Sequence, residues 1–137
     1  MTTIDTIHIL VVDDEPDVEP MFRQKFRRDI RAKRIDFRFE LSAAAALSYL
    51  ESPEARAEAT LILSDINMPG MNGLELLRII KEKYPSLSVF MVTAYGDEQS
   101  KQTAKAYGAS GFINKPVDFS QLKQDIFNLA ETVLSKS

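Results

Sequence analysis

Asp65 follows a short apolar run, Leu61–Leu63, at a point where a buried strand would have to end. A carboxylate in that position is costly unless a positive charge or a metal ion compensates it. Asp13 and Asp14 follow a second apolar run, Ile7–Val12, in the same way. Three neighbouring carboxylates repel one another, and a divalent cation relieves this repulsion. Because an all-oxygen ligand set with room for water suits Mg²⁺, the three aspartates predict a magnesium site.

Two residues suited to binding a phosphoryl group follow later apolar runs. Thr93 ends the run that begins at Leu87, and Lys115 comes directly after Gly111–Asn114. A carboxylate can attack phosphorus to form an acyl phosphate, and phosphoryl transfer depends mainly on positioning and charge neutralisation. Mg²⁺ would take one phosphoryl oxygen, the Lys115 ammonium a second, and the Thr93 hydroxyl with a loop N–H the third. These residues therefore suit a phosphoryl group carried on Asp65.

The elements that position these residues are predicted from apolar runs alternating with amphipathic segments. The predicted strands cover residues 7–12, 35–41, 61–65, 87–93 and 111–114. The predicted helices cover residues 18–30, 43–50, 74–84, 97–107 and 119–133. Such alternation predicts an α/β fold, a doubly wound five-stranded parallel sheet with right-handed crossovers and five helices on its two faces. Ligands of such sheets bind beyond the carboxyl ends of the strands, where the candidate residues would meet.

Some elements carry more specific expectations. The first helix is predicted to be continuous, with a buried face at three- and four-residue spacing. This face is formed by Val18, Met21, Phe22, Phe26 and Ile30. Pro20 should lie in the first turn, where its missing N–H does least harm. The alternating segment 35–41 predicts a strand near an edge of the sheet. The helix 97–107 has little apolar surface beyond Ala104 and Tyr107, so we expect it to be the most loosely held. Side chains expected to cap helices are Ser42, Asn72 and Asp118.

Length and composition limit the classes of protein. The 137 residues, 45% of them hydrophobic, predict a single domain over 1–137 with a core of about 7–134. The absence of cysteine excludes disulfides, thiolate metal sites and a cysteine nucleophile. The net charge of −3 does not indicate a nucleic-acid or membrane partner. No apolar run could span a membrane and the N-terminus is unlike a signal peptide, so a cytoplasmic protein is expected.

The combined motifs resemble a known family. They are Asp13-Asp14, the segment from Asp65 to Gly73, Thr93-Ala94 and Lys115-Pro116. In order and spacing they are similar to the receiver domain of two-component response regulators, including the chemotaxis receivers, from about residue 7 to 133. The resemblance implies a flavodoxin-like sheet with strand order 2-1-3-4-5. It also implies a signalling protein that is not an enzyme in the usual sense, because a receiver catalyses only its own phosphorylation and dephosphorylation.

The resemblance implies roles for residues of the acidic cluster. Asp65 resembles the phosphoacceptor of the family. Asp14 resembles a direct Mg²⁺ ligand, Asp13 a ligand that binds directly or through water, and Asn67 a ligand through its backbone carbonyl.

The resemblance also implies how a phosphoryl group would be sensed. Thr93, Ala94 and Lys115 are expected to contact it, and the Lys115–Pro116 peptide bond is expected to be cis, which would aim the ammonium inward. Phe112 falls at the family's switch position: when Thr93 moves toward Asp65, Phe112 would turn inward and remodel the face of the fourth helix, fifth strand and fifth helix.

The resemblance further implies partners. A sensor histidine kinase or a histidine phosphotransfer protein would donate the phosphoryl group, and an effector protein or a fused output domain would respond. A phosphorylation-dependent homodimer is allowed, whereas direct nucleic-acid and membrane binding are not expected. Tyr95, two residues past Thr93, flanks the path of an attacking water in the family, and its bulk predicts slow autodephosphorylation. Whether the chain is a single-domain regulator or part of a longer protein stays open.

A basic stretch has two main interpretations, and a third, nucleic-acid binding, is disfavoured because no aromatic stacking platform or recognition helix accompanies the stretch. It holds eight of the 17 basic residues: Arg23, Lys25, Arg27, Arg28, Arg31, Lys33, Arg34 and Arg38. One interpretation is a solvated helix face. The other is a docking surface for an acidic partner, since the first helix contacts histidine phosphotransfer proteins in the family.

Two alternative functions differ from a phosphoacceptor. An aspartate-nucleophile phosphatase would carry Asp-x-Asp after the first strand, whereas Asp13 and Asp14 are adjacent here. A phosphorylation-independent interaction module would not need Asp14, Asp65, Thr93 and Lys115 together.

Overall fold

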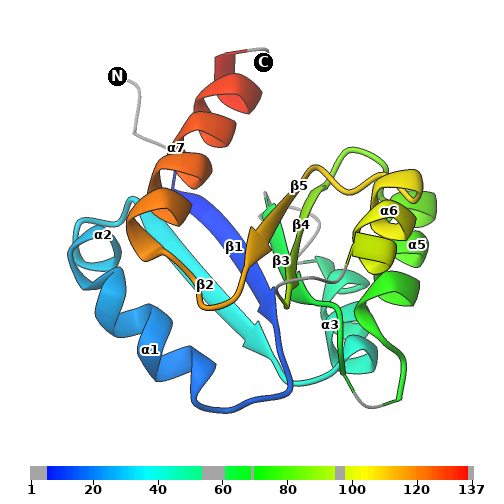
Figure 1. Ribbon diagram of the computed structural model, residues 1–137. Helices are drawn as coiled ribbons and strands as arrows, with labels where there is room; N and C mark the ends of the chain where they lie inside the picture. Colours follow the sequence, from blue (N-terminus) through cyan, green and yellow to red (C-terminus); the bar gives the residue numbers. More distant parts are fainter. Residues whose placement is uncertain (1–5, 54–60, 69, 95–97, 136–137) are drawn as a thin grey trace.

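The structure, a computed structural model, describes residues 6–53, 61–68, 70–94 and 98–135. At its centre is a parallel five-stranded sheet in the order β2-β1-β3-β4-β5 (Figure 1). The strands are β1 (Ile7–Val12), β2 (Ile35–Glu40), β3 (Leu61–Asp65), β4 (Ser88–Thr93) and β5 (Gly111–Asn114). The doubly wound sheet and the strand order 2-1-3-4-5 are confirmed, and β2 lies at an edge as its alternating pattern predicted.

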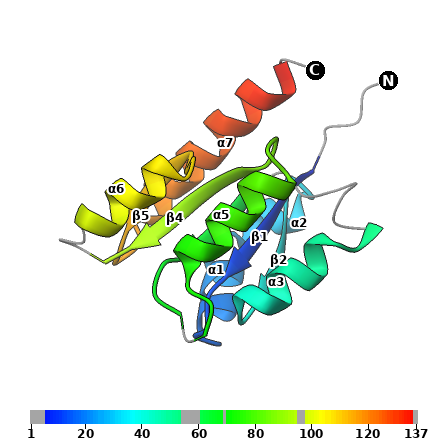
Figure 2. The same cartoon turned by 90° about the vertical axis from the view of Figure 1, so that its right-hand side faces the viewer.

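Helices cover both faces of the sheet. They are α1 (Val18–Lys25), α2 (Arg27–Arg31), α3 (Ala43–Leu50), α5 (Gly73–Lys83), α6 (Glu98–Ala106) and α7 (Phe119–Ser135). Figure 2 views the face that carries α3, α5 and α6; α1, α2 and α7 lie on the opposite face. Since successive side chains of a strand point to opposite faces, Ile9 and Val11 pack in one layer and Leu10 and Val12 in the other. No helix in these residue ranges is long and apolar enough to cross a membrane.

The first predicted helix is divided in two. At Phe26 the backbone leaves helical geometry (φ −106°, ψ 20°), so the described residues contain six helices where five were predicted. The Phe26 ring is fully buried and packs against the rings of Phe22, Phe37 and Phe119. The pattern could not reveal the break, because Phe22, Phe26 and Ile30 keep a helical spacing of four residues across it.

Within α1 one expectation is confirmed and one is wrong. Pro20 is the third residue of the helix and so lies in its first turn. Met21 was predicted to be buried, but it is 43% exposed. Phe22 alone is buried in α1, because this helix packs on the sheet through a narrow strip centred on that ring.

Side-chain caps fix where three helices begin. Ser42 Oγ accepts from the Ala45 N–H at 3.1 Å, and Asn72 Oδ1 accepts from the Glu75 N–H at 2.9 Å. Asp118 Oδ1 accepts from the backbone N–H of Gln121 at 3.2 Å. All three caps were predicted, and each satisfies an N–H that the first helical turn leaves free.

The weak anchoring predicted for 97–107 agrees with the burial of α6. Among the described side chains of α6, Ala104 alone is buried, and Tyr107, just past the helix, is 39% exposed.

Candidate functional site

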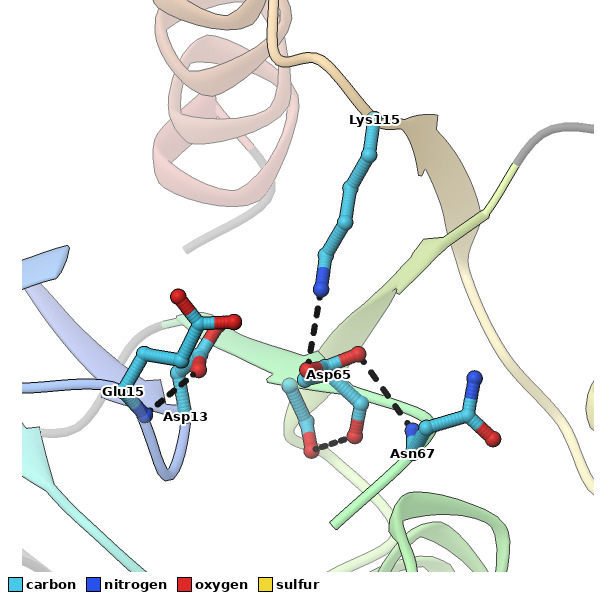
Figure 3. Close-up of polar contacts among 6 residues, drawn as sticks. Asp13, Glu15, Asp65, Asn67 and Lys115 are labelled. Carbon is cyan, nitrogen blue, oxygen red and sulfur yellow. Dashed lines mark hydrogen bonds and ion pairs between the residues drawn. The ribbon is translucent and has the colours of Figure 1, made fainter.

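Asp65 is the last residue of β3, a strand whose five residues are all buried. The side chain of Asp65 is 5% exposed, and each of its oxygens has a partner (Figure 3). The Asn67 N–H donates to Oδ1 at 3.3 Å, and the Lys115 ammonium donates to Oδ2 at 3.0 Å. The buried carboxylate is therefore compensated by a cation that a distant part of the chain supplies.

Two further carboxylates approach Asp65 from the end of β1. Asp13, Asp14 and Asp65 each offer an oxygen, and these oxygens lie within 4.8 Å of one another. The neighbouring strands cause this convergence, because Val12 of β1 pairs with Ser64 of β3. The first two aspartates are half-buried, so water can complete a coordination sphere. An oxygen-only set of this kind can hold a hard divalent cation.

The backbone holds Asp13 in place. Its Oδ1 accepts from the Glu15 N–H at 3.0 Å (Figure 3), and its own N–H donates to the Glu40 carbonyl at the end of β2. Burial raises the pKa of Asp13, and the nearby charge of Asp65 raises it further. The Glu15 N–H and the charge of Lys115 oppose this rise without cancelling it. When the three carboxylates Asp13, Asp14 and Asp65 are ionised, their negative charge is therefore not fully compensated by nearby positive charge.

Lys115 supplies part of that charge. Burial alone would lower the pKa of the Lys115 ammonium, but its hydrogen bond to Asp65 and the charges of Asp65, Asp13 and Glu15 raise it overall. Lys115 thus stays protonated beside the carboxylates, as a phosphoryl-binding group must.

Thr93, at the end of β4, is fully buried, and its hydroxyl donates to Asn114 Oδ1 at 3.2 Å. The structure thus brings Thr93 to the predicted carboxyl edge of the sheet. Its hydroxyl, however, donates its hydrogen bond to a residue of the neighbouring strand β5. Asn114 was not singled out from the sequence. No signal in the sequence marks Asn114, because its contact depends on the parallel register, which pairs Thr93 with the residue before Lys115.

The other candidate residues lie around this centre. Asn67 and Ala94 are exposed, just past the ends of β3 and β4. Phe112 is partly buried in the layer that contains α6, and the Lys101 ammonium lies 5.9 Å from its ring centre. The Lys115–Pro116 peptide bond is cis, as expected. Tyr95 lies outside the described residues.

Gly73, the first residue of α5, packs directly on the backbone of Asp65. A Cβ atom at this position would lie 2.0 Å from the Asp65 carbonyl oxygen, and the Gly73 N–H donates to the Ile66 carbonyl at 2.8 Å. The start of the helix here approaches the end of the strand so closely that only a glycine fits at this position.

Comparisons with known proteins agree with this geometry. The family described as response regulator receiver domain matches residues 9–127. The response regulator protein PilR of Pseudomonas aeruginosa is 33% identical over 117 residues, which cover 84% of this chain and 24% of PilR. An uncharacterised 14.6 kDa protein of Leptolyngbya boryana is 34% identical, with 86% of each chain covered. The chain thus spans about a quarter of the length of PilR but most of the shorter relative.

A solved structure shows the same fold. The response regulator receiver domain protein from Clostridium thermocellum superimposes with a TM-score of 0.83 at 24% identity, covering 96% of this chain and 99% of that one.

Proposed function

Since the chain belongs to the response regulator receiver domain family, we propose that Asp65 is its phosphoacceptor in a two-component signalling system. The observation that carries this proposal is the pairing of Asp65 with Lys115 at 3.0 Å inside a cluster of three carboxylates. A nucleophile, a cation for a phosphoryl oxygen and a place for a metal ion are there side by side. Asp65 is the last residue of β3, so a donor would approach it from beyond the carboxyl edge of the sheet.

The proposed reaction transfers a phosphoryl group from a phosphohistidine. A carboxylate oxygen of Asp65 attacks the phosphorus, the phosphorus–nitrogen bond breaks, and the donor's imidazole leaves. Lys115 neutralises one phosphoryl oxygen, and Thr93 with the Ala94 N–H binds another. Hydrolysis of the acyl phosphate by water would reset Asp65, so the protein catalyses only its own phosphorylation and dephosphorylation.

The cofactor proposed for this reaction is Mg²⁺. Asp13, Asp14 and Asp65 would hold it together with the backbone carbonyl of Asn67. The bound ion would supply positive charge for a phosphoryl oxygen and offset the mutual repulsion of the carboxylates. The raised pKa of Asp13 supports this assignment. Burial and the charge of Asp65 disfavour its ionised form, and a bound cation would stabilise that form.

The proposal is tested by intact-mass analysis after incubation with acetyl phosphate and Mg²⁺. The wild-type protein should gain the mass of one phosphoryl group, stable in acid and lost in base, and Asp65→Asn should gain none. A chelator should abolish the gain. An unmodified wild-type protein would refute the proposal.

The proposed output is a change of surface at α6, β5 and α7. Once Thr93 binds the phosphoryl group, the space it leaves would admit Phe112, which carries no hydroxyl and would therefore switch by packing alone. The thin buried surface of α6 supports this location, because a weakly held helix moves at little energetic cost. We propose that an effector protein, a fused output domain or a second copy of the chain reads this face.

The proposed donor is a sensor histidine kinase or a histidine phosphotransfer protein that docks on the basic stretch. Several of its residues already have partners: Arg23 pairs with Glu19, Arg34 with Asp29, and Arg38 with Glu40. Four others are exposed and make no ion pair or ring contact with a described residue: Arg27, Arg28, Arg31 and Lys33. These four side chains lie on and just after α2. Because their charges are not paired within the described structure, they favour a docking surface for an acidic partner over a solvated helix face.

The docking proposal is tested by reversing charge at Arg27 and Arg28. The double change to Glu should slow transfer from the cognate phosphohistidine protein by about tenfold while the rate with acetyl phosphate stays unchanged. Lys83→Glu with Lys105→Glu, at exposed sites on the opposite face, is the matched control. Equal transfer rates for the two double variants would contradict docking at this site.

Three broader expectations accompany this proposal: a single receiver domain over 1–137 with a core of about 7–134, a cytoplasmic location and slow hydrolysis because of Tyr95. They stay predictions.

A further inference from the structure

The Thr93 hydroxyl has a single proton, and it already uses this proton in a hydrogen bond to Asn114. The Thr93 hydroxyl donates to the Asn114 amide oxygen at 3.2 Å. A threonine hydroxyl can donate only one hydrogen bond at a time. Donation to Asn114 and donation to a phosphoryl oxygen on Asp65 therefore exclude each other.

The backbone of two neighbouring strands holds this pair together. Thr93 and Asn114 are partners in the parallel register of β4 and β5, and the Lys115 N–H donates to the Thr93 carbonyl at 2.9 Å. Asn114 is therefore tied to Thr93 on one side and to the phosphoryl-binding Lys115 on the other. The contact follows from the sheet itself and does not depend on a loop.

The two partners are buried to different extents. Thr93 is 0% exposed, so its hydroxyl requires a partner inside the protein, whereas Asn114 is exposed and can bond to water when released. Exchanging Asn114 for a phosphoryl oxygen therefore leaves no group unsatisfied. The exchange costs only the net strength of one hydrogen bond.

We propose that Asn114 is a positioning residue that holds Thr93 in the resting orientation and competes with the phosphoryl group for its proton. This inference rests on the proposed function. Asn114 would set how far the resting arrangement is favoured, and thus how strongly the site binds a phosphoryl group. Substitutions at Asn114 then tune the switch without touching the acceptor, the metal ligands or Lys115.

The first test measures binding of beryllium fluoride with Mg²⁺, a probe that mimics a phosphoryl group on a carboxylate. Asn114→Ala should bind it about two- to tenfold more tightly than wild type, the range set by losing one competing hydrogen bond. In a Thr93→Val background, which lacks the proton, Asn114→Ala should change the affinity by less than this. Calorimetric titration of the four proteins gives the coupling directly.

A second measurement needs no phosphoryl mimic. In NMR spectra of the protein alone, the Thr93 methyl signal of Asn114→Ala should move toward its position in the wild-type complex with beryllium fluoride. Asn114→Asp keeps an oxygen acceptor, so its Thr93 methyl signal should stay near the wild-type position. A purely structural role for Asn114 would not produce this pattern.

The outcomes separate the inference from the proposed function. A wild-type protein that binds no beryllium fluoride would refute both. If the wild-type protein binds beryllium fluoride, two results would overturn only the inference. One is an Asn114→Ala variant with the affinity of wild type. The other is an Asn114→Ala substitution that changes the affinity equally in the wild-type and Thr93→Val backgrounds. Weaker binding by Asn114→Ala would also overturn it, because Asn114 would then support the bound state.

Discussion

Two groups with different consequences hold the Asp65 carboxylate. The Asn67 N–H, two residues along the chain, fixes one oxygen, and the ammonium of Lys115, just after β5, neutralises the other. The ammonium and a metal ion near Asp13 and Asp14 would both draw on the same negative charge. Competition between the two cations is thus built into the site, and it can be measured.

Replacing Lys115 with methionine should affect the two ligands in opposite directions. Without the ammonium, Mg²⁺ no longer meets a like charge beside Asp65, so its affinity should rise about five- to tenfold, or ~1 kcal/mol. Phosphorylation by acetyl phosphate should slow strongly, because a phosphoryl oxygen loses its cation. Magnesium titration followed by NMR and mass analysis measure the two effects. Weaker Mg²⁺ binding would contradict the account.

Replacing Asp13 with asparagine should also have two opposite effects. Because folding raises the pKa of Asp13, its ionised form is disfavoured in the folded state; the metal-free protein should gain stability as the pH falls toward that pKa. Asn mimics the protonated form, so the melting temperature at neutral pH without Mg²⁺ should rise. Affinity for Mg²⁺ should fall about tenfold or more, since one charge is lost.

The matched control is Asp36→Asn, which makes the same change at an exposed position of β2 paired with His8. It should leave Mg²⁺ affinity unchanged. If it weakened binding as much as Asp13→Asn, net charge rather than ligation would explain the result.

At the scale of elements, the site is formed where four parallel strands end next to one another. β1 delivers Asp13, β3 delivers Asp65, β4 delivers Thr93, and β5 leads to Lys115. Two features of the surrounding elements matter for function: the tight join between β3 and α5, and the thin anchoring of α6.

Adding a methyl group at Gly73 should disrupt the join between β3 and α5. Its Cβ would lie 2.0 Å from the Asp65 carbonyl oxygen, so the acceptor loop must shift. We expect Gly73→Ala to lose about 2 kcal/mol or more of unfolding free energy in urea and to bind Mg²⁺ poorly.

Gly70→Ala is the control, because no described atom beyond its chain neighbours lies within 4 Å of a Cβ placed there, and its positive φ of 75° is what opposes the change. It should cost about 1 kcal/mol and leave the site intact. Equal losses for both variants would argue against close packing as the reason for Gly73.

The thin anchoring of α6 should be visible in amide hydrogen exchange. α5 buries Leu76, Leu77 and Ile80 and α6 only Ala104, so amides of 98–106 should exchange at least about tenfold faster than those in the middle of α5. NMR-detected exchange measures both helices in one sample. Equal protection would mean that α6 is not the mobile part of the switch.

At the scale of the whole molecule, much of the architecture follows from pattern alone. Continuous apolar runs and one alternating apolar–polar segment predicted all five strands. The alternation of strands with helices predicted a parallel sheet, in which the carboxyl ends of the strands meet at one edge. Those two steps suffice to bring Asp13, Asp14, Asp65, Thr93 and Lys115 together. The strand order came instead from the family resemblance, because local pattern carries no information about which strands are neighbours.

The features that could not be predicted depend on contacts between elements. The break at Phe26 accompanies the burial of its ring against Phe37 and Phe119, which lie far away in the sequence. The exposure of Met21 depends on how α1 packs on the sheet, which it does through Phe22. The roles of Gly73 and Asn114 require a distance and a register, which residue type does not encode.

Of the three clustered carboxylates, we propose that Asp65 alone carries the phosphoryl group. Borohydride reduces an aspartyl phosphate to homoserine and leaves free carboxylates unchanged, so it marks the acceptor. After phosphorylation with acetyl phosphate and Mg²⁺, reduction and peptide mapping, homoserine should appear at position 65 alone. Homoserine at position 13 or 14, or a phosphorylated protein with none at 65, would contradict it.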